Sequence, residues 1–194
     1  MDKNIIENQI QMASTQISVG LSSEEYSIVR VELARLINTA LEPEFKTTPP
    51  DPNLEKIVLF SSKRIIGEVV KIPPEQRLEY IQTEILHYEI GKLDWDCREI
   101  AEKSIADSPD MPALQARAKE NLEKVEGYYR FLEEKVPSWE RKFGRQLSEA
   151  RLDCEFVLGA SMHSSLRLGR TIQILQQHGS WPPDWYREIW MKDK

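Results

Sequence analysis

Several features that mark common classes of protein are missing from this chain of 194 residues. No stretch approaches the roughly 20 apolar residues of a membrane-spanning helix, so we expect no membrane partner. The first residues, Met1 to Asn4, lack the basic region and apolar run of a secretory signal peptide. The sequence also contains no glycine-rich phosphate loop, no Cys-x-x-Cys pair and no Gly-x-Ser-x-Gly elbow. The sequence therefore gives no indication of phosphate-loop, Cys-x-x-Cys or serine-hydrolase chemistry.

Cysteine is scarce, and the formal charge is negative. The two cysteines of the chain, Cys97 and Cys154, fall at apolar positions of helical patterns. This placement is typical of reduced core residues in a cytosolic protein rather than of a disulfide framework. A formal net charge of -6 gives no general attraction to polyanions, which argues against a non-specific nucleic-acid binder. The chain is therefore interpreted as cytoplasmic.

The longest regular pattern runs from Trp139 to Leu175. Apolar or small residues recur there at steps of three and four, which is the period of an amphipathic helix. They are Trp139, Phe143, Leu147, Ala150, Cys154, Val157, Ser161, Ser164, Ser165, Leu168, Ile172 and Leu175. Unbroken, such a helix would be about 50 Å long at roughly 1.5 Å per residue. We expect one central helix over 138–178, closed by Gly179.

Helical patterns also cover most of the chain before this segment. The first clear helix begins at Ser22, whose spacing to Glu25 is that of a capping box. It should end near Leu41, because Pro43 disfavours helical backbone at the residue before it.

Two further long helices are predicted, over 74–106 and 112–136. The short link between them makes them antiparallel neighbours. Together with 138–178, they form the expected core of an all-α antiparallel bundle of five or six helices.

The segment 54–72 is ambiguous. A helical pattern runs through it, but Ile57 to Phe60 and Ile65 to Val70 are rich enough in β-branched residues to be two strands. An isolated hairpin would have no sheet to join. Helix is therefore the favoured interpretation.

The chain is divided into three parts on this interpretation. Residues 1–21 are dominated by Gln, Asn and Ser between isoleucines, which predicts a mobile arm or a helix that orders only against a partner. Residues 22–180 form a single helical domain, and residues 181–194 form a tryptophan-rich C-terminal tail.

The tail carries a dense group of large aromatic residues, namely Trp181, Trp185, Tyr186 and Trp190. Tryptophan and tyrosine are enriched at the energetic centres of protein interfaces. The tail is therefore a candidate interaction segment, and the alternative is that it folds back over the protein's own core.

Four arginines suggest an anion site on the predicted central helix. Arg141 and Arg145 are four residues apart, and Arg167 and Arg170 are three residues apart, so each pair shares a helix face. The alternative is that these arginines pair with acidic residues of neighbouring helices.

Glu84 and His87 form a Glu-x-x-His sequence on a predicted helix, where both side chains can hold one metal ion. The sequence resembles half of the ligand motif of ferritin-like di-iron bundles. A second Glu-x-x-His is missing. The alternative is that Glu84 is solvated and His87 borders the core.

A second group of acids spans the predicted helix pair, with Glu99 and Glu102 on one helix and Glu123 and Glu126 on the next. It is similar to the acidic signature of all-α nucleotide pyrophosphohydrolases, and the resemblance implies Mg²⁺-dependent hydrolysis. The chain departs from that signature at Glu126, where the family usually has aspartate. The alternative is that these acids lie on solvated faces and in pairs within one helix.

We expect a cytoplasmic, non-enzymatic interaction or regulatory protein that binds a protein partner or self-associates, without a cofactor. Long amphipathic helices, few residues of catalytic type and the aromatic tail favour this function. The alternative is an enzyme similar to the metal-dependent nucleotide pyrophosphohydrolases.

Overall fold

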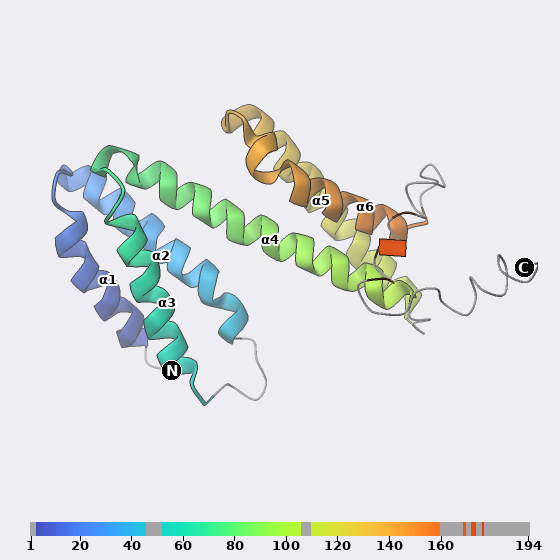
Figure 1. Ribbon diagram of the computed structural model, residues 1–194, viewed down its shortest axis with the longest axis horizontal. Coiled ribbons are helices and arrows are strands. Elements are labelled where there is room, and N and C mark those ends of the chain that lie inside the picture. Colours follow the sequence, from blue (N-terminus) through green and yellow to red (C-terminus); the bar gives the residue numbers. More distant parts are fainter. Residues whose placement is uncertain are drawn as a thin grey trace, which may run out of the picture. The chain divides into compact units, whose positions relative to one another are not determined.

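The computed structural model describes residues 3–45, 52–105 and 110–159, together with residues 169, 172, 173 and 176. Within these residues all regular structure is helical (Figure 1), which confirms the predicted all-α helical bundle. The α-helices are α1 (Lys3–Ile17), α2 (Ser23–Phe45), α3 (Leu54–Val69), α4 (Arg77–Ile105), α5 (Met111–Lys135) and α6 (Arg145–Val157). A 3₁₀ turn, Pro74–Gln76, precedes α4, and a π-helical turn, Glu140–Gly144, precedes α6. None of the helices in these ranges is long and apolar enough to cross a bilayer.

The chain separates into two compact units, Met1–Glu89 and Ile90–Lys194, and the boundary falls inside α4. The first unit contains α1, α2, α3 and the first part of α4. The second unit contains the rest of α4, α5 and α6. A single domain over 22–180, as the sequence pattern suggested, stays a prediction, and the tail 181–194 lies outside the described residues.

The first helix, α1, lies in the segment for which we expected a mobile arm or a helix that orders only against a partner. Residues 3–17 are helical, and Ile6, Ile10 and Ile17 are buried. These isoleucines are four and seven residues apart, so they lie on one side of the helix, and the polar residues between them lie on the other. In the first unit α1 packs against both α2 and α3.

The second helix, α2, begins with the predicted capping box. The main-chain N–H of Ser22 donates to Glu25 Oε2 at 2.8 Å, and the N–H of Glu25 donates to Ser22 Oγ at 3.3 Å. The predicted end near Leu41 is wrong, because the helix continues through Pro43 to Phe45. Pro43 lies in the last turn, where it removes one main-chain hydrogen bond but leaves little helix to be kinked.

The third segment, α3, settles the ambiguity between helix and hairpin. Residues 54–69 are helical, which confirms the favoured interpretation. The buried residues Val58, Ile65 and Val69 face a core shared by the four helices of the first unit. Its buried members are Ile6, Ile10, Ala13, Ile17, Val29, Leu33, Leu36, Ile37, Leu41, Val58, Ile65, Ile66, Val69, Ile81 and Ile85.

A buried arginine joins three helices of the first unit. Arg77, the first residue of α4, is only 6% exposed. Its guanidinium donates to the main-chain carbonyls of Ile17 at 2.7 Å, Ile72 at 2.9 Å and Val70 at 3.3 Å. Ile17 ends α1, and Val70 is the C-cap of α3, so Arg77 satisfies carbonyls that lack a partner within their own helices.

The second unit has its own core, formed by the C-terminal part of α4 with α5 and α6. Its buried apolar residues are Ile90, Leu93, Cys97, Ile100, Ala101, Leu114, Ala118, Val125, Leu132, Phe143, Leu147, Ala150, Cys154 and Val157. Polar contacts add to this packing. Asn121 of α5 donates to the Asp96 carboxylate of α4 at 2.5 Å, and Arg117 pairs with the same carboxylate.

The expected unbroken helix over 138–178 is wrong. The segment starts with the π-helical turn 140–144, and α6 ends at Val157. Gly159 has φ +66°, a left-handed conformation that ends a right-handed helix. Residues 160–168 lie outside the described residues. The core of the second unit therefore rests on α4, α5 and the shorter α6.

We predict that Arg77→Met lowers the stability of the first unit by about 3 kcal/mol or more. Methionine keeps an unbranched stem but removes all donors, and each buried carbonyl left without a partner costs about 1–3 kcal/mol. Amide hydrogen exchange of the buried α1 residues measures the change. The control is Arg64→Met at an exposed position of α3, where a change within about 0.5 kcal/mol is expected. Equal effects of the two substitutions would contradict the role given to Arg77.

A second pair of substitutions compares a glycine in the turn between α1 and α2 with a glycine inside α3. Gly20 has φ +87°, and a Cβ added there would lie 2.9 Å from Pro74 Cγ. We expect Gly20→Ala to destabilise the first unit by about 1–3 kcal/mol, through backbone strain and the clash with the proline ring. Gly67→Ala is the opposite case, because Gly67 is inside α3 and nothing lies within 4 Å of an added Cβ. It should stabilise the unit by about 0.5–1 kcal/mol. Chemical denaturation measures the change in the free energy of unfolding for both variants. Changes of the same sign would contradict the different backbone environments given to the two glycines.

Candidate functional site

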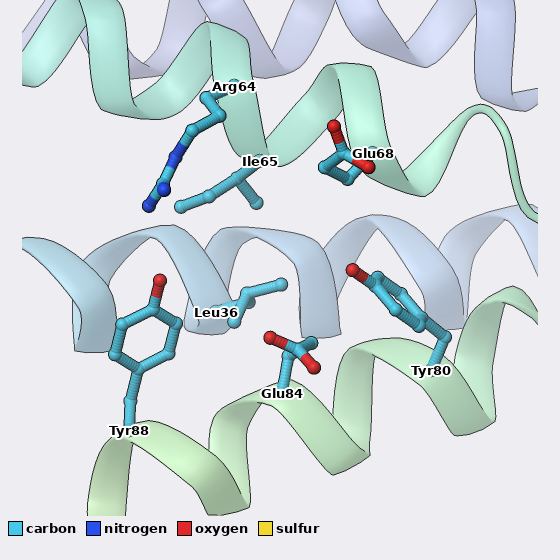
Figure 2. A pocket seen from close by; sticks show the side chains of 7 residues that line it. All are labelled: Leu36, Arg64, Ile65, Glu68, Tyr80, Glu84 and Tyr88. Carbon is cyan, nitrogen blue, oxygen red and sulfur yellow. The ribbon is translucent and has the colours of Figure 1, made fainter. Parts of the chain in front are cut away.

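The first unit contains a pocket between α2, α3 and α4. Its volume is about 230 Å³, and its lining comes from all three helices. Figure 2 shows the side chains that line it: Leu36 from α2, Arg64, Ile65 and Glu68 from α3, and Tyr80, Glu84 and Tyr88 from α4. Leu36 and Ile65 are buried core residues, so the pocket has an apolar floor and a polar wall on either side.

The wall on α4 is set by helical periodicity. Tyr80, Glu84 and Tyr88 follow one another at intervals of four residues, which places them on one face of the helix. The next face carries Ile81 and Ile85, which are buried in the core and therefore fix the rotation of the helix. All three polar side chains are partly buried. Figure 2 shows Glu84 between the two tyrosines.

The wall on α3 is built in the same way. Arg64 and Glu68 are four residues apart on one face, and both are exposed. In Figure 2, Arg64 lies towards Tyr88, and Glu68 lies towards Tyr80 and Glu84. The carboxylate of Glu68 also pairs with Lys71 at 2.8 Å on the same helix. The charges along the pocket are therefore separated, with the positive side chain at the Tyr88 end.

The Tyr80 end of the pocket is electrostatically negative. The pKa of the Tyr80 phenol is raised above its ordinary value, first by burial and then by the carboxylates of Glu84 and Glu68 and by Tyr88. Both acids disfavour the negative phenolate, so Tyr80 keeps its proton at neutral pH. The same potential that opposes a phenolate would attract a positively charged group.

Glu84 is the unusual member of this group. It is partly buried, yet within the described part of the chain its carboxylate takes part in no hydrogen bond or ion pair. Water still reaches the carboxylate, because neither of its oxygens is among the fully buried side-chain atoms that lack a partner. Glu84 therefore has capacity for a partner that enters the pocket.

The structure places the two residues of the predicted metal site, Glu84 and His87, on α4. Glu84 lines the pocket, and His87 is not among the residues that line it. In the described ranges, no group of three or more His, Cys, Asp or Glu side chains is arranged to hold a metal ion. The metal-binding role of these two residues stays a prediction without structural support.

Two of the four predicted acids on α4 and α5 form ion pairs, one within a helix and one between helices. Glu99 pairs with Lys103 at 2.5 Å within α4, and Glu126 pairs with Arg151 of α6 at 3.3 Å. Glu123 is exposed and Glu102 is partly exposed. Among the described residues, none of these acids belongs to a group of three or more potential metal ligands, and a role in nucleotide hydrolysis also stays a prediction.

The structure describes two of the four arginines of the predicted anion site and none of the aromatic tail. Arg145 pairs with Glu149 at 3.1 Å, and Arg141 is exposed. Arg167 and Arg170 lie outside the described residues. So do the four aromatic residues of the tail, Trp181, Trp185, Tyr186 and Trp190. The interaction and anion-binding roles of these residues stay predictions.

Sequence reasoning missed most of the pocket. Tyr80, Tyr88 and Arg64 were not singled out, although the four-residue spacing of Tyr80, Glu84 and Tyr88 is visible in the sequence. That spacing identifies a helix face with two aromatic rings around a carboxylate. The opposing Arg64 belongs to another helix, and no local pattern connects it with α4.

Comparison with known proteins gives no relative. No family model matches the chain, and searches of curated proteins and of solved structures found no significant match. Functional inference therefore depends on the residues described above.

We predict that Glu84→Gln lowers the pKa of Tyr80 towards its ordinary value. The substitution removes a negative charge that opposes the phenolate, whereas burial, the largest cause of the raised pKa, is unchanged. A pH titration of the tyrosine ring carbons by NMR measures the shift. Glu79→Gln is the matched control, because Glu79 is exposed and is not among the groups that raise the pKa of Tyr80. A Tyr80 pKa unaffected by Glu84→Gln would show that Glu84 does not set the potential in the pocket.

Proposed function

We propose that this protein is a non-enzymatic, regulatory interaction protein, and that the pocket between α2, α3 and α4 receives a basic side chain of a protein partner. The observation that carries the proposal is the Glu84 carboxylate, which is partly buried between two tyrosines and has no pairing group in the described chain. A lysine or arginine entering the pocket would supply that pair.

The chemistry of the walls supports a positively charged guest. An ammonium or guanidinium group would meet the carboxylate of Glu84, with the carboxylate of Glu68 nearby. The rings of Tyr80 and Tyr88 would offer cation–π contacts, which contribute about 0.5–2 kcal/mol depending on desolvation. Arg64, at the Tyr88 end, would direct the guest's charge towards Glu84 and away from itself.

The size of the pocket favours a side chain over a small-molecule ligand. Its volume is about 230 Å³, whereas sites that enclose drug-sized ligands usually hold roughly 300–1,000 Å³. A single lysine or arginine side chain is a better match than a nucleotide or an organic cofactor.

An exposed aromatic residue beside the pocket supports a protein as the source of that side chain. Phe60 is 72% exposed and lies one turn before Arg64 on the face of α3 that also carries Glu68. Aromatic residues anchor protein interfaces. A partner that placed an apolar side chain on Phe60 would set a neighbouring basic residue close to the pocket mouth.

We further propose that this binding takes place in the cytoplasm, where free cysteines such as Cys97 and Cys154 are common. The partner is a different protein or a second copy of this chain. Sedimentation velocity over a range of protein concentrations separates these cases, because only self-association changes the sedimentation coefficient of the isolated protein.

The first test is an NMR titration of the full chain with N-acetyl-lysine amide and N-acetyl-arginine amide. We expect shifts at Tyr80, Glu84 and Tyr88 that saturate on the order of millimolar concentration, which is usual for a single small contact of about 4 kcal/mol. N-acetyl-glutamate should give no such shifts. Glu84→Gln should abolish the response, and Glu79→Gln should retain it. The proposal fails if neither cation shifts these residues, or if Glu84→Gln binds as well as the natural protein.

A leucine-flanked heptapeptide with one central lysine then tests the role of Phe60. We expect Phe60→Ala to weaken the peptide several-fold, because the apolar contact is lost, while leaving N-acetyl-lysine amide unaffected. Equal peptide affinities would remove Phe60 from the proposed binding surface but would leave the pocket itself in place.

A further inference from the structure

Two buried thiols face each other in the core of the second unit. Cys97 on α4 and Cys154 on α6 are 0% and 1% exposed, and their Sγ atoms lie 3.3 Å apart. Both are free cysteines, and they are the only cysteines of the chain. If the thiols served only apolar packing, each would need to be buried. The two sulfur atoms would not need to be in contact with each other.

We propose that Cys97 and Cys154 form a reversible disulfide site that covalently joins α4 to α6. A disulfide bond is about 2.05 Å long, so the two sulfurs would have to approach by somewhat more than 1 Å. The residues are 57 positions apart, and the closed loop would contain all of α5. The product would therefore link the first and last helices of this core around the middle one.

The oxidant that the site requires is a low-molecular-weight disulfide of the glutathione class. The thiolate of one cysteine attacks a sulfur of the oxidant, forming a mixed disulfide and releasing one small thiol. The thiolate of the second cysteine then attacks the protein sulfur of the mixed disulfide and releases the second small thiol. The two protein thiols lose two protons and two electrons in total, and the oxidant is reduced to two thiols.

The surroundings of the pair keep it unreactive while the second unit is closed. The pKa of the Cys97 thiol is raised far above its ordinary value by the hydrogen bond with Cys154, by burial and by the carboxylates of Asp96 and Asp153. Because only the thiolate attacks a disulfide, the closed unit reacts slowly. Oxidation therefore depends on transient opening of the helices, and the disulfide traps them once they reclose.

The consequence is a core that becomes harder to open after oxidation. A cross-link restricts the unfolded chain, and the effect increases with the number of residues in the closed loop. In a reducing compartment such a disulfide would be transient, which is the usual behaviour of redox-sensing pairs in cytosolic proteins. This site lies in the second unit and does not depend on the proposed function of the pocket in the first.

Oxidation of the full chain by excess glutathione disulfide tests the proposal. We expect the intact mass to fall by two hydrogens per chain, with no bound glutathione and no covalent dimer. Since the chain has two cysteines, this product can only be the Cys97–Cys154 disulfide. The oxidised protein should melt several degrees higher than the reduced protein, and dithiothreitol should restore the original Tm. Sub-denaturing urea should accelerate the reaction by allowing the helices to open.

The single-cysteine variants Cys97→Ala and Cys154→Ala are the matched controls. Each should acquire at most one glutathione under the same conditions, and neither should gain in Tm. The proposal is overturned if the natural protein carries two glutathiones, forms covalent dimers, keeps both thiols free even in urea, or melts no higher after the disulfide forms. These outcomes concern the natural protein and so do not depend on whether the variants fold.

Discussion

The first unit depends on one buried charge, the guanidinium of Arg77. A positive charge at the start of a helix is unfavourable in isolation, because it meets the positive end of the helix dipole. Arg77 is stable there because its donors reach the carbonyls of Ile17 and Val70 at the C-terminal ends of α1 and α3, and that of Ile72 just beyond. Those ends carry partial negative charge. A single side chain thus neutralises two helix ends and fixes the point from which α4 starts.

The position of the pocket follows from this contact. Once the start of α4 is fixed, the buried Ile81 and Ile85 determine which face of the helix points to the core, and the adjacent face presents Tyr80, Glu84 and Tyr88 to α3. The ends of α1 and α3 are held by the same guanidinium, so the α3 wall of the pocket is positioned together with the α4 wall. Pocket residues held on rigid helices in this way would need little reorganisation if the proposed guest entered.

Sequence patterns predicted the helices better than their ends or their contacts. Periodicity identified α2, α4 and α5, the capping box at Ser22 was recognised, and α3 was favoured as a helix against its β-branched composition. The differences between prediction and structure arose where tertiary contacts or a single main-chain torsion determine the conformation. The sparse isoleucines of α1 are buried only because α2 and α3 cover them, and the positive φ of Gly159 ends α6 inside an otherwise continuous pattern. The pocket escaped prediction because Arg64 and Tyr88 come from different helices, and no local spacing shows that Glu84 lacks a partner.

Arg77 and Glu84 differ in how their charges are satisfied, and this difference bears on the proposed function. Arg77 is almost fully buried, and all three of its hydrogen bonds end on main-chain carbonyls, so its environment is complete. Glu84 is less deeply buried, and the described chain supplies no hydrogen bond or ion pair to its carboxylate. The nearby Glu68 is paired with Lys71. Glu84, by contrast, lines the pocket. An apolar residue at the position of Glu84 would serve the packing of the helices better than a carboxylate does. The carboxylate between the two tyrosines is instead the feature on which we base the proposed binding of a basic side chain.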